Sequence, residues 1–205
     1  MADVFELGGD LVEHSVAHNL VRLMAEGTGE DEEADLELRG EAVETFLPLL
    51  SKPALPSVLV ETMAWVLGEY GYISSSAALP EVAEKVVDLA SRDGLDPWTR
   101  TYGVQSTMKL SAQLGSIAPG MTDVMNKCSR SRDTILAQTC LEAQNLTQRI
   151  GTMKAVMPVD ASCEDIEVDE EMSFLNSFVN EALAAGAKTY SPPESIVAAE
   201  AEKGP

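Results

Sequence analysis

The chain has 205 residues, of which 34 are acidic and 14 basic, giving a formal net charge of −20, and only 5% are aromatic. Because phosphate binding needs a basic surface, this charge argues against nucleic acid as a general partner. No signal peptide is evident and no apolar run approaches the roughly 20 residues of a membrane span, so any membrane association is expected to be peripheral or through partners.

The first 27 residues predict an irregular lead-in followed by one helix. Residues 1–12 show no helical period, whereas apolar side chains recur at helical spacing from His14 until Gly27. His14 and His18 share a face of this helix, as a zinc-binding pair does. No third ligand is evident, so a structural pair is the favoured interpretation.

An acidic run over residues 28–35 precedes the second predicted helix. The run lacks the DxDxDG spacing of a calcium loop, so we interpret it as a solvated loop with helix caps, which the helix dipole favours. The apolar positions of the helix that follows are Leu36, Val43, Phe46, Leu47 and Leu50.

The segment from Pro56 to Gly71 shows two apolar stripes at helical spacing, which is typical of an inner helix covered from both sides. The stripes consist of Leu59, Met63, Val66, Leu67 and Tyr70, and of Val58, Thr62 and Trp65. Gly68 costs a helix about 1 kcal/mol relative to alanine, which indicates a close approach of another element. Gly71 stands where a left-handed C-cap is expected.

Four further helices are expected, separated by glycine and proline turns. They cover residues 80–92, 97–114, 121–129 and about 133–150, and the last fades near Met157. Their apolar positions are Val82, Val86 and Leu89; Trp98, Thr101, Val104, Met108 and Ser111; Met121, Val124 and Met125; and Ile135 or Leu136, Cys140, Ala143, Leu146 and Ile150.

Successive helix pairs, at residues 14–50, 56–92 and 97–129, have the length of about 40 residues that is typical of HEAT and armadillo arrays. The predicted fold class is therefore all-α, with residues 1–157 forming an α-solenoid of antiparallel helix pairs.

The remaining residues differ in composition. Residues 158–190 predict an acidic extended segment and a terminal helix, capped by Asp169, and residues 191–205 are expected to be a disordered tail at the start of a hinge. The apolar set of the helix needs a surface, so we expect it to cap the last helix pair. That set is Met172, Leu175, Phe178, Val179 and Leu183.

No catalytic or nucleotide-binding motif is present, so neither an enzyme nor a cofactor is expected. The cysteines are odd in number and lack a CxxC pair, which favours a reduced compartment; they are Cys128, Cys140 and Cys163. Asp160, Glu164 and Asp165 are interpreted as a solvated acidic linker rather than a metal or acid–base site.

Residues 92–154 hold 8 basic and 5 acidic side chains, a net +3, in an otherwise acidic chain. Lys127, Arg130 and Arg132 are the candidate contacts for an acidic partner in this segment. A solvated turn between helices is the competing interpretation, and the favoured one.

The sequence Trp65-Val-Leu-Gly-Glu-Tyr-Gly71 resembles the WxLGEYG segment of the large adaptin subunits of heterotetrameric adaptor-protein (AP) complexes. The motif residues are Trp65, Leu67, Gly68, Glu69, Tyr70 and Gly71. Within this family the chain resembles the epsilon type of adaptor complex 4, through Gly8-Gly9-Asp10, residues 20–27, Met157-Pro158-Val159-Asp160, Ser162-Cys163-Glu164-Asp165, Val168-Asp169, residues 172–179 and Tyr190-Ser191-Pro192-Pro193. Pro158, Asp160, Cys163, Glu164 and Asp165 are the matched positions of the tail.

The resemblance implies a structural subunit of a vesicle coat, which sorts cargo at the trans-Golgi network together with beta, mu and sigma subunits. It implies a cytoplasmic protein held peripherally on Golgi and vesicle membranes. It covers only the C-terminal end of an adaptin trunk, so we expect a truncated gene model, a fragment or a short paralogue. A small GTPase of the Arf class would bind the missing N-terminal trunk. The alternative is a generic HEAT-repeat scaffold with unrelated partners.

Overall fold

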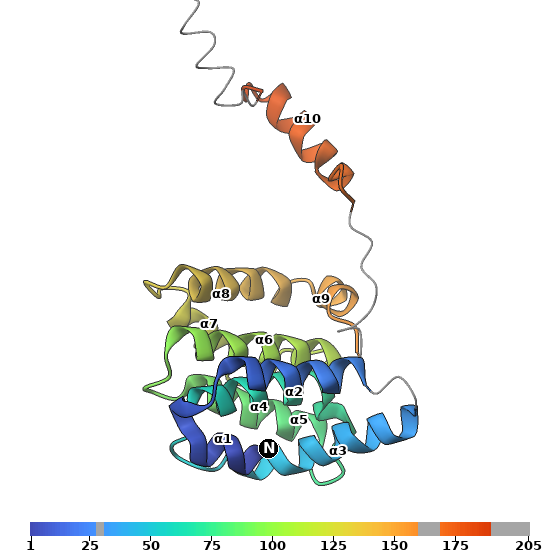
Figure 1. Ribbon diagram of the computed structural model, residues 1–205. Coiled ribbons are helices and arrows are strands. Elements are labelled where there is room, and N and C mark those ends of the chain that lie inside the picture. Colours follow the sequence, from blue (N-terminus) through green and yellow to red (C-terminus); the bar gives the residue numbers. More distant parts are fainter. Residues whose placement is uncertain (28–30, 160–168, 190–205) are drawn as a thin grey trace, which may run out of the picture. The chain divides into compact units, whose positions relative to one another are not determined.

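The computed structural model describes residues 1–27, 31–159 and 169–189, and these fall into two units. The first unit holds the described residues up to Val159, and the second holds residues 169–189. Every regular element within the described ranges is a helix, which confirms the all-α class (Figure 1).

The first unit contains nine α-helices and two short 3-10 helices within its described residues. They are α1 (Ala2–Gly8), η1 (Gly9–Leu11), α2 (His14–Glu26), α3 (Glu32–Leu49), α4 (Ser57–Tyr70), η2 (Gly71–Ile73), α5 (Leu79–Ser91), α6 (Pro97–Leu114), α7 (Met121–Cys128), α8 (Thr134–Thr147) and α9 (Ile150–Val156). The prediction of an irregular lead-in is wrong, because α1 packs against α4 and buries Phe5 completely.

The helices form two layers. In one layer α2, α4, α6 and α8 are successive neighbours, and α3, α5 and α7 lie against them in the other (Figure 1). This arrangement confirms a solenoid of helix pairs. The tightest sequential pairs are α3–α4, α5–α6 and α7–α8, so the pairing expected from the sequence is shifted by one helix. A helix that is apolar on two faces packs against both the preceding and the following helix in the sequence. The spacing of its apolar residues does not show which of the two interfaces is larger.

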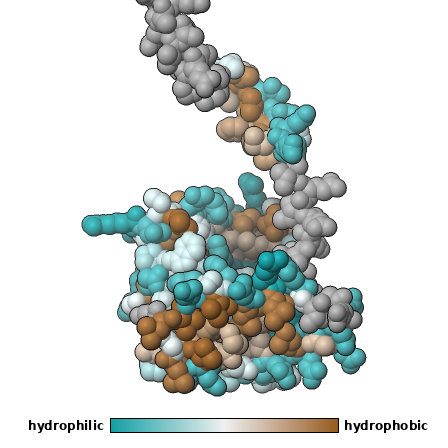
Figure 2. Space-filling model, viewed as in Figure 1, coloured by the Kyte–Doolittle hydropathy of each residue, from teal (hydrophilic) through white to brown (hydrophobic). Residues whose placement is uncertain are grey.

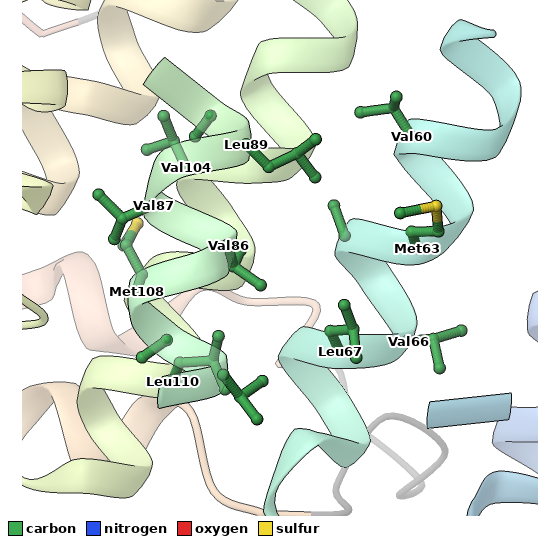
Figure 3. Packing of buried hydrophobic residues seen from close by; sticks show 14 of the residues in the cluster. Val60, Met63, Val66, Leu67, Val86, Val87, Leu89, Val104, Met108 and Leu110 are labelled. Atoms are coloured by element: carbon green, nitrogen blue, oxygen red, sulfur yellow. The ribbon is translucent and has the colours of Figure 1, made fainter. Parts of the chain in front are cut away.

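Helix α4 is the centre of the first unit, and all of its residues except Ser57 and Trp65 are buried. Its apolar side chains face those of α5 and α6, as Figure 3 shows for Val60, Met63 and Leu67 opposite Leu89, Val104 and Leu110. The close approach expected at Gly68 is confirmed, since a Cβ there would lie 2.9 Å from the Cα of Ser106 on α6.

Gly71 is not a left-handed cap. Its φ of −57° and ψ of −22° are right-handed, and the chain continues from it into η2. A Cβ at this position would lie 2.9 Å from Val82 and 3.3 Å from Leu110, so the glycine provides space for packing. Gly115, by contrast, has the left-handed conformation that ends α6.

The long helix expected from Asp133 is two helices, because the chain breaks at Gln148 and Arg149 between α8 and α9. Leu136 is buried and Ile135 exposed, which resolves the alternative left open by the spacing. Leu36 and Trp98 are also exposed, although each was assigned to an apolar stripe. Each lies directly beside a buried residue, Asp35 in α3 and Thr99 in α6, so the two side chains are on uncovered faces of covered helices.

The second unit consists of η3 (Ser173–Leu175) and α10 (Asn176–Ala184) within its described residues. Asp169 does not cap α10, which begins seven residues later. Its carboxylate accepts bonds from the backbone N–H groups of Glu171 and Ser173, and Met172 is left-handed, so a local turn precedes the helix. The predicted linker at residues 160–168 and the predicted tail from residue 190 lie outside the described residues.

Candidate functional site

The tyrosine of the WxLGEYG segment connects three helices. Tyr70 is fully buried, and its hydroxyl donates to the carbonyl oxygen of Met24 at the end of α2 over 3.2 Å. The guanidinium of Arg39 on α3 lies 4.9 Å from the ring centroid, and its Nε donates to the same carbonyl oxygen over 2.9 Å. The motif therefore fixes the end of α2 against α3 and α4.

The glutamate of the motif connects α4 to α6. Glu69 is buried and forms an ion pair with Lys109, whose side chain is only 19% exposed. Gln113 donates from Nε2 to the carbonyl oxygen of Gly68 over 2.9 Å. Removing one partner of such a pair leaves an uncompensated buried charge, so this contact holds the two helices in register.

Trp65 is the half-buried member of the motif and lies between two cavities. Its ring meets the ring of Tyr70 edge-on, with 5.9 Å between the centroids. One cavity has a volume of about 270 Å³ and the other of about 120 Å³, and Trp65 and Tyr102 line both. The larger is also lined by Gly68, Glu69, Gln105, Ser106, Lys109 and Met157, and the smaller by Ala17, His18, Val21, Glu61 and Thr62.

Glu61 is a buried carboxylate that the sequence analysis missed. It is 6% exposed and accepts a hydrogen bond from the Thr99 hydroxyl over 2.9 Å. Burial raises the pKa of Glu61, although the Thr99 bond and the nearby histidines oppose this shift. An acidic residue in the middle of a two-stripe apolar helix was the available signal, because carboxylates are seldom buried without a partner.

The two histidines of α2 lie in different surroundings. His14 is 60% exposed, with Nδ1 3.4 Å from Glu61, and His18 lines the smaller cavity. Among the described residues no group of three histidine, cysteine or acidic side chains is arranged to hold a metal ion. The interpretation as a structural pair stays a prediction.

Lys127 lies in the last turn of α7, and Arg130 and Arg132 lie between α7 and α8. All three side chains of this basic cluster are exposed. The Nζ of Lys127 lies 3.2 Å from an Asp93 carboxylate oxygen, in an exposed pair that contributes little stability. A role of this cluster in binding an acidic partner stays a prediction.

The tail positions of the family motif fall mostly outside the described residues. Pro158 is exposed near the end of the first unit, and the other four are not among the described residues; they are Asp160, Cys163, Glu164 and Asp165. Cys128 and Cys140 are free and buried. Burial raises the pKa of Cys140 to about 12, which keeps it a thiol and makes it a poor nucleophile.

Within the described residues, every helix is too short or too polar to cross a membrane. No family model matches the sequence, and no solved structure matches it either.

Curated proteins of one kind match the chain along nearly its whole length. It is 40% identical over 200 residues to the AP-4 complex subunit epsilon of Arabidopsis thaliana, covering 93% of this chain and 21% of that protein. It is 36% identical over 195 residues to the AP-4 complex subunit epsilon-1 of Homo sapiens, covering 94% and 17%. The Dictyostelium discoideum subunit is 24% identical over 200 residues, covering 88% and 18%.

The chain thus spans about a fifth of the length of these relatives. The matched region extends over more than nine tenths of the sequence, so it includes the WxLGEYG segment and the helices from α3 to α9. The chain matches AP-4 complex epsilon subunits, which are epsilon-type large adaptins, at 34–40% identity over the part of their length that it covers.

Proposed function

We propose that the chain is a structural segment of a vesicle-coat adaptor complex, in which it acts as a rigid scaffold for intracellular protein transport. The observation that carries this proposal is the identity of 34–40% to AP-4 epsilon subunits over almost the whole chain. The role is structural rather than enzymatic: the segment holds other subunits of the complex in fixed positions.

Three buried or half-buried arginines support a rigid scaffold, because each caps the carbonyl end of a helix. Arg39 donates to carbonyl oxygens at the end of α2, and Arg92 to those of Leu50 and Lys52 after α3. Arg100 donates to Ala90 and to Arg92 at the end of α5, over 2.7 Å each. A cation at the C-terminal end of a helix is favoured by the helix dipole, and a guanidinium satisfies several carbonyls at once.

The partners in this proposal are the beta, mu and sigma subunits of an adaptor complex. An exposed apolar surface on α1, η1 and α2 is available for packing against protein, and it appears as a brown patch in Figure 2. Its members are Val4, Leu7, Leu11, Val16 and Leu23. Patches of this kind on a monomer mark interaction surfaces. Association with the trans-Golgi network is peripheral and occurs through the complex, and an Arf-class GTPase binds a different part of the subunit.

Affinity purification of the endogenous full-length product tests this proposal. We expect beta, mu and sigma adaptins to be recovered with it in equal amounts. A version with Leu7 and Leu11 replaced by glutamate is expected to recover less of at least one subunit, whereas Ile135→Glu, an exposed apolar position on α8, serves as the matched control. Recovery of a different set of proteins, without any adaptin, would favour the generic HEAT-repeat scaffold.

A further inference from the structure

Glu61, Trp65 and Glu69 follow one another at intervals of four residues along α4, so they share one face of the helix. This face borders the two cavities described above, with Trp65 between them. Each cavity therefore has one buried carboxylate and shares the same aromatic pair. The two sites differ in what meets the carboxylate.

In the larger cavity the charge of Glu69 is compensated from within, because Lys109 of α6 supplies an ammonium group to it. In the smaller cavity Glu61 meets the neutral hydroxyl of Thr99 and the imidazole of His14, which is exposed and 3.4 Å away. A buried carboxylate is stabilised far better by a cation than by a hydroxyl. The Glu69 site thus has a lysine cation beside it, whereas the Glu61 site has imidazoles, which are cations only when they are protonated.

A second carboxylate increases the negative charge beside the smaller cavity. The Thr99 hydroxyl lies 2.9 Å from Glu61 and 2.6 Å from Asp96, but it carries one proton and donates it to one of them at a time. Asp96 also accepts from the Ser57 hydroxyl and from the backbone N–H of Thr99. Glu61 is therefore the carboxylate with the weaker set of donors.

The aromatic walls of the cavity are held in place. Trp65 is supported edge-on by the fully buried Tyr70, and Tyr102 is supported edge-on by Trp98, with 5.7 Å between the centroids. Aromatic rings attract a cation over their faces, most strongly for tryptophan. Because these two rings are already held in place, they lose little conformational entropy when a charged side chain binds between them.

We propose that the smaller cavity, between α2, α4 and α6, is a binding site for an arginine side chain presented by a partner protein. Its guanidinium pairs with Glu61, and its planar head and alkyl stem lie against Trp65 and Tyr102. The volume of about 120 Å³ suits one side chain, and the net charge of −20 favours the approach of a basic segment. Arginine fits better than lysine because its planar fork both stacks and pairs.

Tryptophan fluorescence gives a direct test with the full chain. The sequence has two tryptophans, so Trp98→Phe leaves Trp65 as the single indole reporter and keeps an aromatic edge on Tyr102. The probe is the peptide acetyl-Gly-Gly-Arg-Gly-Gly-amide, and its control is the same peptide with citrulline, which has the shape of arginine without the charge. We expect a saturable response to the arginine peptide and binding about tenfold or more weaker for citrulline.

Glu61→Gln tests the carboxylate itself, because glutamine still accepts from Thr99 and so preserves the local packing. We expect it to weaken binding of the arginine peptide about tenfold and to leave the citrulline peptide unchanged. Glu84→Gln makes the same charge change at an exposed position on α5 and is expected to have no effect.

Equal affinity for the two peptides, no saturable response, or unchanged binding by a folded Glu61→Gln variant would overturn the proposal. If Glu61→Gln unfolds, the comparison of arginine with citrulline on the otherwise unaltered chain decides the question. These measurements use the chain and a peptide alone, so their result is independent of whether the adaptor subunits co-purify.

Discussion

The interface between α4 and α6 and the outer face of α1, η1 and α2 are both rich in apolar side chains, but only the first is covered. Between α4 and α6 the packing is tight enough to require a glycine at position 68, and a buried ion pair fixes the register. On the outer face Leu7 and Leu11 are 87% and 92% exposed. The first region holds the unit together, and the second is available for association.

The largest effect is expected at the covered interface. Tyr70→Ala removes a fully buried ring and the hydroxyl bond to Met24, so the free energy of unfolding should fall by about 3–5 kcal/mol. Tyr70→Phe removes only the hydroxyl and should cost about 1 kcal/mol. Chemical denaturation followed by circular dichroism measures both, and a cost for Tyr70→Ala below that of Tyr70→Phe would contradict the assignment.

Alanine substitutions at two helical glycines distinguish the effect of close packing on stability from the effect of helix propensity. At Gly68 an added Cβ meets the backbone of Ser106, so Gly68→Ala should lower the free energy of unfolding by about 1–3 kcal/mol. At Gly40 in α3 an added Cβ meets nothing within 4 Å, so Gly40→Ala should raise it by up to about 1 kcal/mol. Thermal melts of both variants check this, and the same sign of effect at both positions would break the comparison.

The uncovered face should control self-association rather than stability. Wild-type chain is expected to self-associate with rising concentration in sedimentation velocity, and Leu7→Glu combined with Leu11→Glu should shift it towards the monomer. Because both side chains are exposed, the free energy of unfolding should change by no more than about 0.5 kcal/mol per substitution. A wild-type monomer at all concentrations would show that this face does not self-associate.

A second exposed apolar surface lies on η3 and α10, since Phe174 of η3 and Phe178 of helix α10 are exposed. We propose that this helix caps the solenoid, which predicts slow proteolysis between Val159 and Asn180. Phe178→Asp should then speed cleavage several-fold, whereas Glu170→Lys should leave the rate unchanged. Rapid cleavage of the wild-type chain with the solenoid left intact would favour a tail that binds another subunit.

The smallest effect concerns the connection between η2 and α5. Hydrogen bonds from Ser76, Ser75 and Ser74 lower the pKa of Glu44 from 4.5 to about 2. A lowered pKa means that this contribution to stability is present above pH 4.5 and is lost as the pH falls towards 2. The difference in melting temperature between wild type and Glu44→Gln should therefore be constant above that pH and shrink below it. A difference that does not change with pH would contradict the role of the carboxylate.

Helical spacing was enough to predict α2 to α8, the all-α class and the central position of α4, because burying one face of a helix forces a period of 3.6 residues on the apolar residues. The close approach at Gly68 was also predictable, since a glycine inside a strongly apolar helix costs stability unless packing requires it. The resemblance to large adaptins rested on short stretches such as residues 65–71, which can be read directly from the sequence without the tertiary structure.

Tertiary structure decided everything that depends on which surfaces meet. It determined that Gly71 makes room for Val82 and Leu110, that Leu136 rather than Ile135 is buried, and that α1 is a helix covered through Phe5. It also brought Glu61 beside Thr99, 38 positions away in the sequence, and placed Trp65 between two cavities. Spacing in a sequence reports the period of one helix, whereas a site built from α2, α4 and α6 exists only when the three helices pack.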